Sequence, residues 1–242
     1  MSKGLNIALI GYGKMGKAIE SIAIERGHHI SLRIGSSNPD QFTTENLQQC
    51  DVAIEFTNPE SAVENIRKCL EAGTAVICGS TGWLEHLPAI KALCKEKHGA
   101  FLYASNFSVG VNIFFEVNKC LAKLMARQNE YDVSIEEIHH TQKKDAPSGT
   151  AITLAEQVLQ EVSRKTKWAN EQTDAPSNLT ITSKRIDPAP GTHVIKYSSP
   201  VDEIEIKHTA HSRGGFALGA VLAAEFIHNK NGTFNMKDVL GL

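Results

Sequence analysis

The sequence predicts an α/β protein, in which a parallel sheet covered by helices is joined to a smaller α+β domain. Apolar runs of strand length alternate with helical patterns as far as residue 106, and a glycine-rich turn follows the first apolar run. Beyond residue 106 this alternation weakens, and several strands follow one another. Strands that alternate with helices predict a parallel sheet with both faces covered, whereas consecutive strands predict a separate sheet with more antiparallel pairs.

A length of 242 residues and a balanced charge set the broad class of the protein. Two domains are expected from this length. The 25 lysines and arginines nearly balance the 27 aspartates and glutamates without a long run of either sign, which argues against nucleic acid as a partner. The first apolar run, residues 7–10, is too short for a signal peptide or a membrane span, so we expect a cytoplasmic protein without a membrane partner. The cysteines form no Cys-x-x-Cys pair and are expected to be reduced packing residues: Cys50, Cys69, Cys78, Cys94 and Cys120.

The first element is a buried strand at residues 5–10, and a glycine-rich turn leads from it into a helix with an apolar face. In this turn Gly11 would permit the tight bend, Gly13 would let the backbone approach a pyrophosphate, and Gly16 would let helix and strand pack closely. An ordinary tight connection is the simpler alternative. Because the turn follows a strand, opens a helix and starts a series of such units, we favour a Rossmann-like dinucleotide-binding domain.

The strands of this domain are expected at residues 29–34, 51–56, 74–78 and 100–104, with helices at residues 60–72 and 84–97 between the later ones. In parallel sheets of this kind, ligands bind at the carboxyl ends of the strands. The loops at these ends are small and polar, and they should face one crevice: Gly11-Tyr12-Gly13, Thr57-Asn58-Pro59, Gly79-Ser80-Thr81-Gly82 and Ser105-Asn106-Phe107.

The end of the second strand bears on the choice between NADH and NADPH. An acidic residue at this place usually binds the adenosine ribose, but the sequence continues Arg33-Ile34-Gly35-Ser36-Ser37 without a carboxylate. We therefore expect NADPH to be used at least as well as NADH, with Arg33 or the Ser36-Ser37 pair near the 2′-phosphate.

The second domain is expected to hold a long helix at residues 109–127, a strand at residues 131–138 and a helix after Ser148. Ile138 falls out of the two-residue phase of that strand, which suggests a β-bulge before His139. An exposed connection at residues 164–178 should lead to three strands, at residues 179–185, 192–197 and 201–208, in a mostly antiparallel sheet. The final helix, at residues 215–228, should pack back on the first domain. The domains are thus expected at residues 1–106 with 214–242, and at residues 107–213.

Residues 139–150 carry the groups best suited to chemistry. His139, His140 and Lys143 are proton donors, and Ser148-Gly149-Thr150 opens a helix whose free N–H groups would attract a carboxylate. Each piece has a simpler explanation, since paired histidines are often exposed and Ser148 could merely cap the helix. Their proximity nevertheless favours an anion pocket lined with acid groups. Adjacent histidines lack the spacing of metal ligands, so no metal site is expected.

These segments resemble the dihydrodipicolinate reductase family, whose members are 4-hydroxy-tetrahydrodipicolinate reductases, and the resemblance runs almost from end to end. The most specific match is Glu137-Ile138-His139-His140, followed by Lys143 and by residues 144–151, Lys-Asp-Ala-Pro-Ser-Gly-Thr-Ala. Weaker matches are residues 13–16, 55–59, 79–82 and 106–112, with Ser212-Arg213 before Phe216. Two departures concern the cofactor: the first loop is one residue shorter than the commoner form, and the acidic residue after the second strand is missing.

The resemblance implies an NAD(P)H-dependent oxidoreductase that reduces 4-hydroxy-tetrahydrodipicolinate to tetrahydrodipicolinate in lysine and diaminopimelate synthesis, as a homotetramer. It implies that His139 is the general acid/base, Lys143 the proton donor and His140 a substrate contact, with Gly149 and Thr150 holding a substrate carboxylate. Lys144 has no such role. The family's cofactor-lining segments correspond to Gly11, Tyr12, Gly13, Lys14, Met15, Gly16, Gly79, Ser80, Thr81, Ala104, Ser105, Asn106 and Phe107, and more weakly to Arg213 and Phe216.

Two other functions are compatible with parts of the chain. Another two-domain NAD(P)-dependent dehydrogenase of amino-acid precursor metabolism would share the nucleotide domain. An aspartate-semialdehyde dehydrogenase would also need a nucleophilic cysteine beside a histidine, and neither Cys78 nor Cys120 has that context. A non-enzymatic nucleotide sensor would have no use for the histidines, the lysine and the anion-binding helix start.

Overall fold

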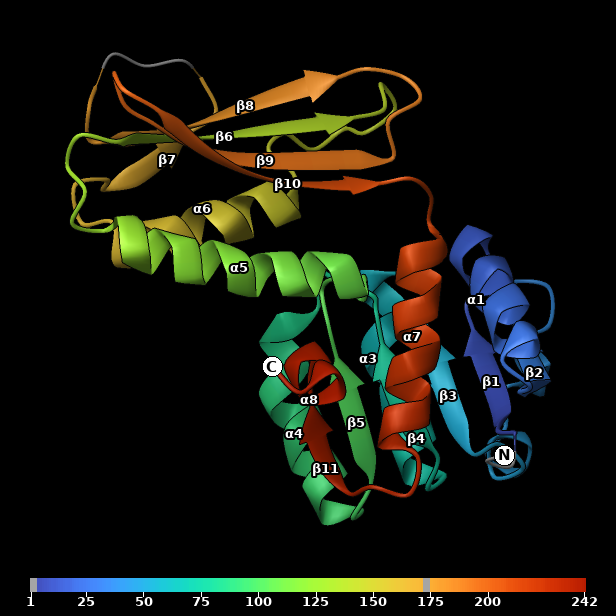
Figure 1. Cartoon of the computed structure of the whole chain (residues 1–242). Helices are drawn as coiled ribbons and strands as arrows, with labels where there is room; N and C mark the ends of the chain where they lie inside the picture. The colour runs from blue at the N-terminus through green and yellow to red at the C-terminus, as the bar shows by residue number, and fades with distance from the viewer. Residues whose placement is uncertain (1–3, 172–174) are drawn as a thin grey trace. The chain divides into compact units, whose positions relative to one another are not determined.

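The computed structural model describes residues 4–171 and 175–242, and these residues divide into two compact units. The first unit extends to Val109 and resumes at Arg213–Leu242, and the second is Gly110–Ser212. Each unit has its own sheet (Figure 1). No helix among the described residues is long and apolar enough to cross a bilayer.

The sheet of the first unit has the strand order β11-β5-β4-β3-β1-β2, and its neighbouring strands are parallel throughout. This confirms the expected Rossmann-like parallel sheet. β11 was not expected, because three residues after the last helix are too few for a periodic pattern. The strands are β1 (Asn6–Ile10), β2 (His29–Ile34), β3 (Val52–Glu55), β4 (Ala75–Cys78), β5 (Ala100–Tyr103) and β11 (Gly232–Phe234).

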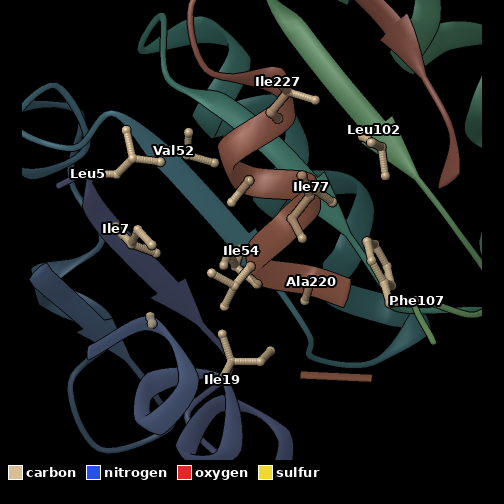
Figure 2. Close-up of a cluster of buried hydrophobic side chains, with 14 of the residues drawn as sticks. Leu5, Ile7, Ile19, Val52, Ile54, Ile77, Leu102, Phe107, Ala220 and Ile227 are labelled. Carbon is tan, nitrogen blue, oxygen red and sulfur yellow. The ribbon is translucent and has the colours of Figure 1, made fainter. Parts of the chain in front are cut away.

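Helices cover both faces of this sheet. On one face α1 (Lys14–Glu25) and α7 (Gly214–Ile227) bury Ile19, Ala220 and Ile227 against strand side chains (Figure 2). On the other face α3 (Pro59–Glu71) and α4 (Leu87–Glu96) bury a second cluster. The final helix therefore packs on the first unit, as expected, and its small residues allow a close approach. The remaining short helices are α2 (Thr44–Leu47), α8 (Met236–Leu240) and the 3-10 turns Pro39–Gln41 and Leu84–His86.

The second unit is a five-stranded sheet of order β10-β9-β6-β8-β7, with two helices, α5 (Val109–Met125) and α6 (Gly149–Glu161), that bury their apolar sides in its core. β9 is antiparallel to both β10 and β6, whereas β6, β8 and β7 run parallel. The expectation of a mostly antiparallel sheet is therefore wrong. A helix between two strands returns the chain to its starting end, so α6 makes the following strands parallel to β6. The strands are β6 (Asp132–His139), β7 (Lys167–Ala169), β8 (Asn178–Arg185), β9 (Gly191–Ser198) and β10 (Glu203–Ala210).

Two further expectations need correction. The connection at residues 164–178 is not simply exposed, because it contains β7 and a buried lysine, Lys165, whose ammonium donates to the carbonyls of Pro176 and Asn178 at 2.8 Å. Residues 172–174 of that connection lie outside the described part. All five cysteines are free, but only four of them are packing residues, since Cys120 is exposed on α5.

Candidate active site

The three glycines of the turn in the first unit differ in the space around them. Gly11 has φ +96°, and a Cβ placed there would lie 2.0 Å from the Phe56 carbonyl oxygen. A Cβ on Gly16 would lie 2.4 Å from the carbonyl oxygen of Gly11. A Cβ on Gly13 would meet nothing within 4 Å. Gly11 and Gly16 are thus required by the fold itself, whereas the space beside Gly13 is open for a ligand.

Two hollows adjoin this turn at the carboxyl ends of the strands. The larger has a volume of about 770 Å³ and is lined by Gly11, Tyr12 and Gly13, by residues 33–39 and by the loop after β3. The smaller has a volume of about 460 Å³ and is lined by residues 13–16, the loop after β3 and Gly79, Ser80 and Thr81. The structure therefore brings together nine of the expected cofactor residues, those at 11–16 and 79–81. Gly13, the N-cap of α1, offers no side chain to the first N–H groups of the helix, which suits them to an anion.

The remaining expected cofactor residues do not line these hollows. Ala104 and Phe107 are buried, and the Phe107 ring packs on Phe56 with 5.5 Å between ring centroids. Ser105 and Asn106 follow β5 beside the end of β4, because the Ala104 N–H donates to the Cys78 carbonyl. Arg213 is the exposed N-cap of α7, and Phe216 is half-buried.

Arg33 lines the larger hollow, but its guanidinium is already paired. Its Nε donates to Glu20 Oε1 at 2.9 Å, and Glu20, on α1, also accepts from the Tyr12 hydroxyl. A carboxylate thus lies beside this end of the hollow although none follows β2 in the sequence. Glu20 was missed because it lies on the helix, thirteen residues before Arg33.

In the second unit, β6 carries the candidate catalytic residues in a regular register. Its pairing with β8 and β9 shows no shift up to His139, so the expected bulge before the histidines is wrong. Val133, Ile135, Glu137 and His139 all point to the buried side, and Ile138 to the other side, where it is half-buried. The inward face simply changes from apolar to polar along the strand.

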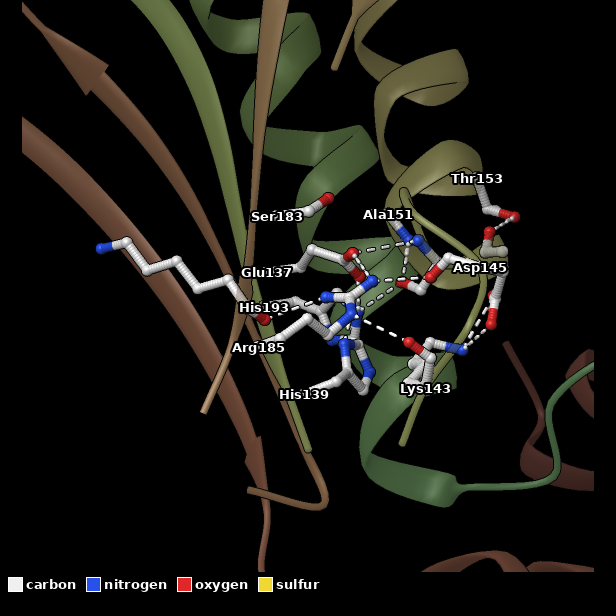
Figure 3. Close-up of polar contacts among 12 residues, drawn as sticks. Glu137, His139, Lys143, Asp145, Ala151, Thr153, Ser183, Arg185 and His193 are labelled. Atoms are coloured by element: carbon white, nitrogen blue, oxygen red, sulfur yellow. Dashed lines mark hydrogen bonds and ion pairs between the residues drawn. The ribbon is translucent and has the colours of Figure 1, made fainter. Parts of the chain in front are cut away.

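Glu137 is fully buried and is the centre of the polar cluster at this end of β6 (Figure 3). Its Oε1 accepts from the Ser148 N–H and from Arg185 Nη2, each at 3.1 Å. Its Oε2 lies 3.2 Å from His139 Nδ1 and 3.8 Å from His193 Nε2. Burial alone would raise the pKa of Glu137, but its contacts with His139, Ser148, Ser183 and Arg185 together hold that pKa well below the usual range.

The loop between β6 and α6 brings the other expected residues to this cluster. The ammonium of Lys143 contacts both carboxylate oxygens of Asp145 at 2.8 Å, and Arg185 donates to the main-chain carbonyls of Lys143 and Asp145. Ser148 caps α6 by accepting from the Ala151 N–H at 3.2 Å. Gly149 is exposed at the start of α6, and a Cβ there would meet nothing within 4 Å. His140 and Thr150 are half-buried, and Lys144 is exposed.

The roles of three members of the cluster were not predicted from the sequence. Arg185 and His193 were not singled out, and Glu137 was noted only as part of the family motif. The sequence did indicate that Glu137 is buried, because alternate residues of a strand share a face and Glu137 alternates with Val133 and Ile135. Arg185 and His193 come from β8 and β9, and only strand pairing places them opposite β6. Burial, followed by the nearby charge of His139, lowers the pKa of His193 to about 4, so His193 is neutral at pH 7.

The chain matches models of one enzyme family along most of its length. Residues 5–107 match the N-terminal part of dihydrodipicolinate reductase, and residues 110–240 match its C-terminal part. The chain belongs to the dihydrodipicolinate reductase family. Members of this family are NAD(P)H-dependent oxidoreductases, which confirms the expected class and cofactor.

Named relatives and solved structures agree with this assignment. The 4-hydroxy-tetrahydrodipicolinate reductase of Christiangramia forsetii is 48% identical over 238 residues, covering 98% of each chain. The enzyme of the same name from Neisseria meningitidis is 36% identical over 231 residues, covering 92% of this chain and 84% of that one. The dipicolinate-bound dihydrodipicolinate reductase of Paenisporosarcina sp. TG-14 has the same fold, with a TM-score of 0.77 at 21% identity over 97% of this chain and 98% of the other.

Proposed function

We propose that this chain reduces 4-hydroxy-tetrahydrodipicolinate, a cyclic imine dicarboxylate, to tetrahydrodipicolinate with NAD(P)H, in lysine and diaminopimelate synthesis. One observation carries the proposal. At the end of β6, in a chain of this family, a buried histidine, a lysine and the N-terminus of α6 lie around one buried carboxylate. Such a group of residues can bind an anion and deliver a proton beside it.

The first unit has features that fit the cofactor. Gly13 leaves space at the N-terminus of α1, where free N–H groups favour a pyrophosphate, and the hollow of about 770 Å³ continues toward Ser36 and Ser37. Residues 11–16 and 79–81 would hold the dinucleotide, with residues 104–107, Arg213 and Phe216 as further contacts. The bound nicotinamide supplies a hydride, which is the redox part of the reaction.

The second unit would hold the substrate and supply the proton. Gly149 and Thr150, at the start of α6, receive a substrate carboxylate, and His140 makes a further contact. His139 acts as general acid/base, and Lys143 as proton donor. Asp145 keeps the Lys143 ammonium at the loop until a substrate carboxylate competes for it.

The proposed enzyme is an oligomer that can use NADPH. Residues 107–213 would form the substrate-binding and oligomerisation domain of a cytoplasmic homotetramer. Large apolar side chains exposed on α5 and β10 support an assembly through this unit, among them Val117, Leu124 and Ile204. NADPH is expected to serve at least as well as NADH, because no carboxylate follows β2 and the nearby Glu20 carboxylate is already paired with Arg33.

The substitution His139→Gln tests the chemical role. It should lower kcat by about 10²–10⁴, the usual contribution of general acid/base catalysis, while cofactor affinity stays unchanged. The assay uses freshly prepared 4-hydroxy-tetrahydrodipicolinate and follows the loss of NAD(P)H absorbance. His86→Gln, an exposed histidine of the first unit, is the control. Full turnover by His139→Gln excludes the role of His139, and no turnover by the unmodified protein with either nucleotide would favour a different dehydrogenase.

A further inference from the structure

Glu137 has no part in the proposed chemistry, yet it is fully buried and its carboxylate contacts Ser148, Arg185 and two histidines. A buried carboxylate is costly unless charged or hydrogen-bonded partners compensate it. Here the compensating partners are themselves parts of the proposed active site or hold such parts in place. The role of Glu137 therefore follows from the contacts of its two carboxylate oxygens.

The first oxygen organises the main chain around the site. Oε1 accepts from the Ser148 N–H, at the cap of α6, and from Arg185 Nη2, each at 3.1 Å. The same guanidinium donates to the carbonyl oxygens of Lys143 at 3.3 Å and of Asp145 at 2.6 Å. Through these bonds Glu137 ties the start of α6 to the loop that carries Lys143.

The second oxygen faces His139. Oε2 and His139 Nδ1 are both buried and lie 3.2 Å apart. Neither atom makes a hydrogen bond of good geometry with any residue in the ranges 4–171 and 175–242, this contact included. An unprotonated Nδ1 would leave two buried acceptors in repulsion at this distance. A proton on Nδ1 removes this conflict. The neutral ring is then the Nδ1–H tautomer, and Nε2 is the atom that can exchange a proton.

The surroundings of the ring are consistent with a free Nε2. A Cβ on Gly191 would lie 3.0 Å from this atom, so the glycine leaves room beside it. His193, whose ring centroid is 5.1 Å from that of His139, bonds instead to the Ser148 hydroxyl through its Nε2 at 3.1 Å. The ionisable groups around Glu137 and His139 are Lys143 and Asp145 on the loop, Arg185 on β8, His193 on β9 and His208 on β10.

We propose that Glu137 is a positioning residue: one oxygen fixes His139 as the Nδ1–H tautomer, and the other holds the Lys143 loop and the cap of α6. The proposal rests on the acid/base role of His139 proposed above. A metal ion is the competing explanation, since one atom each of Glu137, His139 and His193 lie within 4.8 Å of one another. The guanidinium of Arg185 on the same carboxylate already supplies the positive charge that such an ion would bring.

The test is the isosteric substitution Glu137→Gln, read by ¹⁵N NMR of the histidine rings. Because Oε1 accepts from two donors, the amide oxygen should take its place and leave the NH₂ group facing His139 Nδ1. The neutral ring should therefore change from the Nδ1–H to the Nε2–H tautomer. The His139→Gln spectrum identifies the signal, and thermal unfolding shows that the variant is folded.

Kinetics provide the second readout. We expect Glu137→Gln to lower kcat by about 10²-fold with KM changed less than about threefold. Glu136→Gln is the matched control, because Glu136 is the preceding residue, points to the other side of the sheet and pairs with Lys184 at 2.6 Å. It should leave both readouts unchanged.

Several results would overturn the proposal. An Nε2–H tautomer for His139 in the unmodified protein does so without any variant, even if Glu137→Gln fails to fold. An unchanged tautomer and an unchanged kcat in a folded Glu137→Gln protein would do so as well. Stoichiometric zinc that resists chelation and is lost from this variant would also overturn it. The tautomer is independent of turnover, so full activity of His139→Gln would reject the proposed role of His139 while the NMR result still reports on Glu137.

Discussion

Among the residues that the structure describes, each unit buries one carboxylate near the end of a strand, but the two carboxylates have different partners. Glu55, on β3, accepts from neutral groups: the Thr57 N–H at 3.0 Å, the Ser80 hydroxyl at 3.1 Å and the Cys78 thiol at 3.0 Å. Glu137, on β6, contacts a guanidinium and two imidazoles. The first carboxylate ties together two loops of the nucleotide cleft, and the second adjusts groups that can gain or lose a proton.

This difference matches the tasks proposed for the two units. The dinucleotide has to be held without proton transfer, for which backbone N–H groups, hydroxyls and glycines suffice. A proton donor needs a charged environment that sets its protonation state. Changes of charge should therefore affect catalysis and pH dependence in the second unit, whereas changes of volume should affect the fold and the cofactor in the first.

After His139→Gln, the largest effect is expected for Lys143→Met. Loss of a proton donor should lower kcat by about 10²–10³, since general acid catalysis contributes this order of magnitude, while binding of NADPH stays unchanged. Steady-state kinetics and fluorescence titration with NADPH measure the two properties. Lys144→Met is the control, because Lys144 is the adjacent residue and is exposed. Equal losses in the two variants would mean that only the net charge of the loop matters.

The stability of the second unit should depend on pH through His193. Its pKa is depressed from 6.5 to about 4 in the folded protein, so the unfolded chain binds a proton between these values and the folded chain does not. The stabilisation is therefore complete above pH 6.5 and is lost as the pH falls toward 4. The loss should be about 2 kcal/mol by pH 5.

Urea unfolding at pH 7.5 and pH 5 measures this loss. Trp83→Phe leaves Trp168, which packs on the core of the second unit, as the fluorescent reporter. In the same background His193→Asn should unfold with a much smaller pH dependence. If the two proteins lose the same free energy between the two pH values, another group is responsible.

The sequence predicted most of the first unit because its signals are local. Strand runs, the spacing of Gly11, Gly13 and Gly16, and the polar strand ends all lie within short segments, and the parallel sheet follows from them. β11 and the pairing of Arg33 with Glu20 were not predicted, because each depends on contacts between distant segments.

The candidate site in the second unit was predicted only in part. The segment from His139 to Thr150 was found because it is contiguous. Arg185 and His193 are brought to it by the register of β8 and β9 with β6, which no local pattern specifies. The predicted bulge was wrong for a different reason. The inward face changes from apolar to polar at Glu137 and His139, and this change was taken for a break in the strand.

In the glycine turn, substitutions can separate an effect on stability from an effect on cofactor binding. Gly11→Ala should destabilise the protein by at least about 2 kcal/mol, because its positive φ disfavours alanine and its Cβ would lie 2.0 Å from a carbonyl oxygen. Gly13→Ala should leave stability unchanged and weaken NADPH binding by about tenfold, because its Cβ would occupy only the space proposed for the pyrophosphate. Thermal unfolding and titration with NADPH measure these effects. Normal cofactor affinity in Gly13→Ala would place the pyrophosphate elsewhere.

The smallest effect is expected for Glu20→Gln, which tests the charge beside Arg33 in the larger hollow. Glu20 compensates the Arg33 guanidinium, so its neutralisation should leave more positive charge for a 2′-phosphate and favour NADPH over NADH. The Arg33 side chain is 43% exposed, and exposed pairs contribute at most about 1 kcal/mol, so the ratio of kcat/KM values should rise about two- to fivefold. Added salt should reduce this change, because it screens exposed charges. Glu25→Gln removes the same charge from an exposed position of α1 and should leave the ratio unchanged. An unchanged ratio in Glu20→Gln would mean that Arg33 does not contact the phosphate and that Ser36 and Ser37 are its remaining candidate partners.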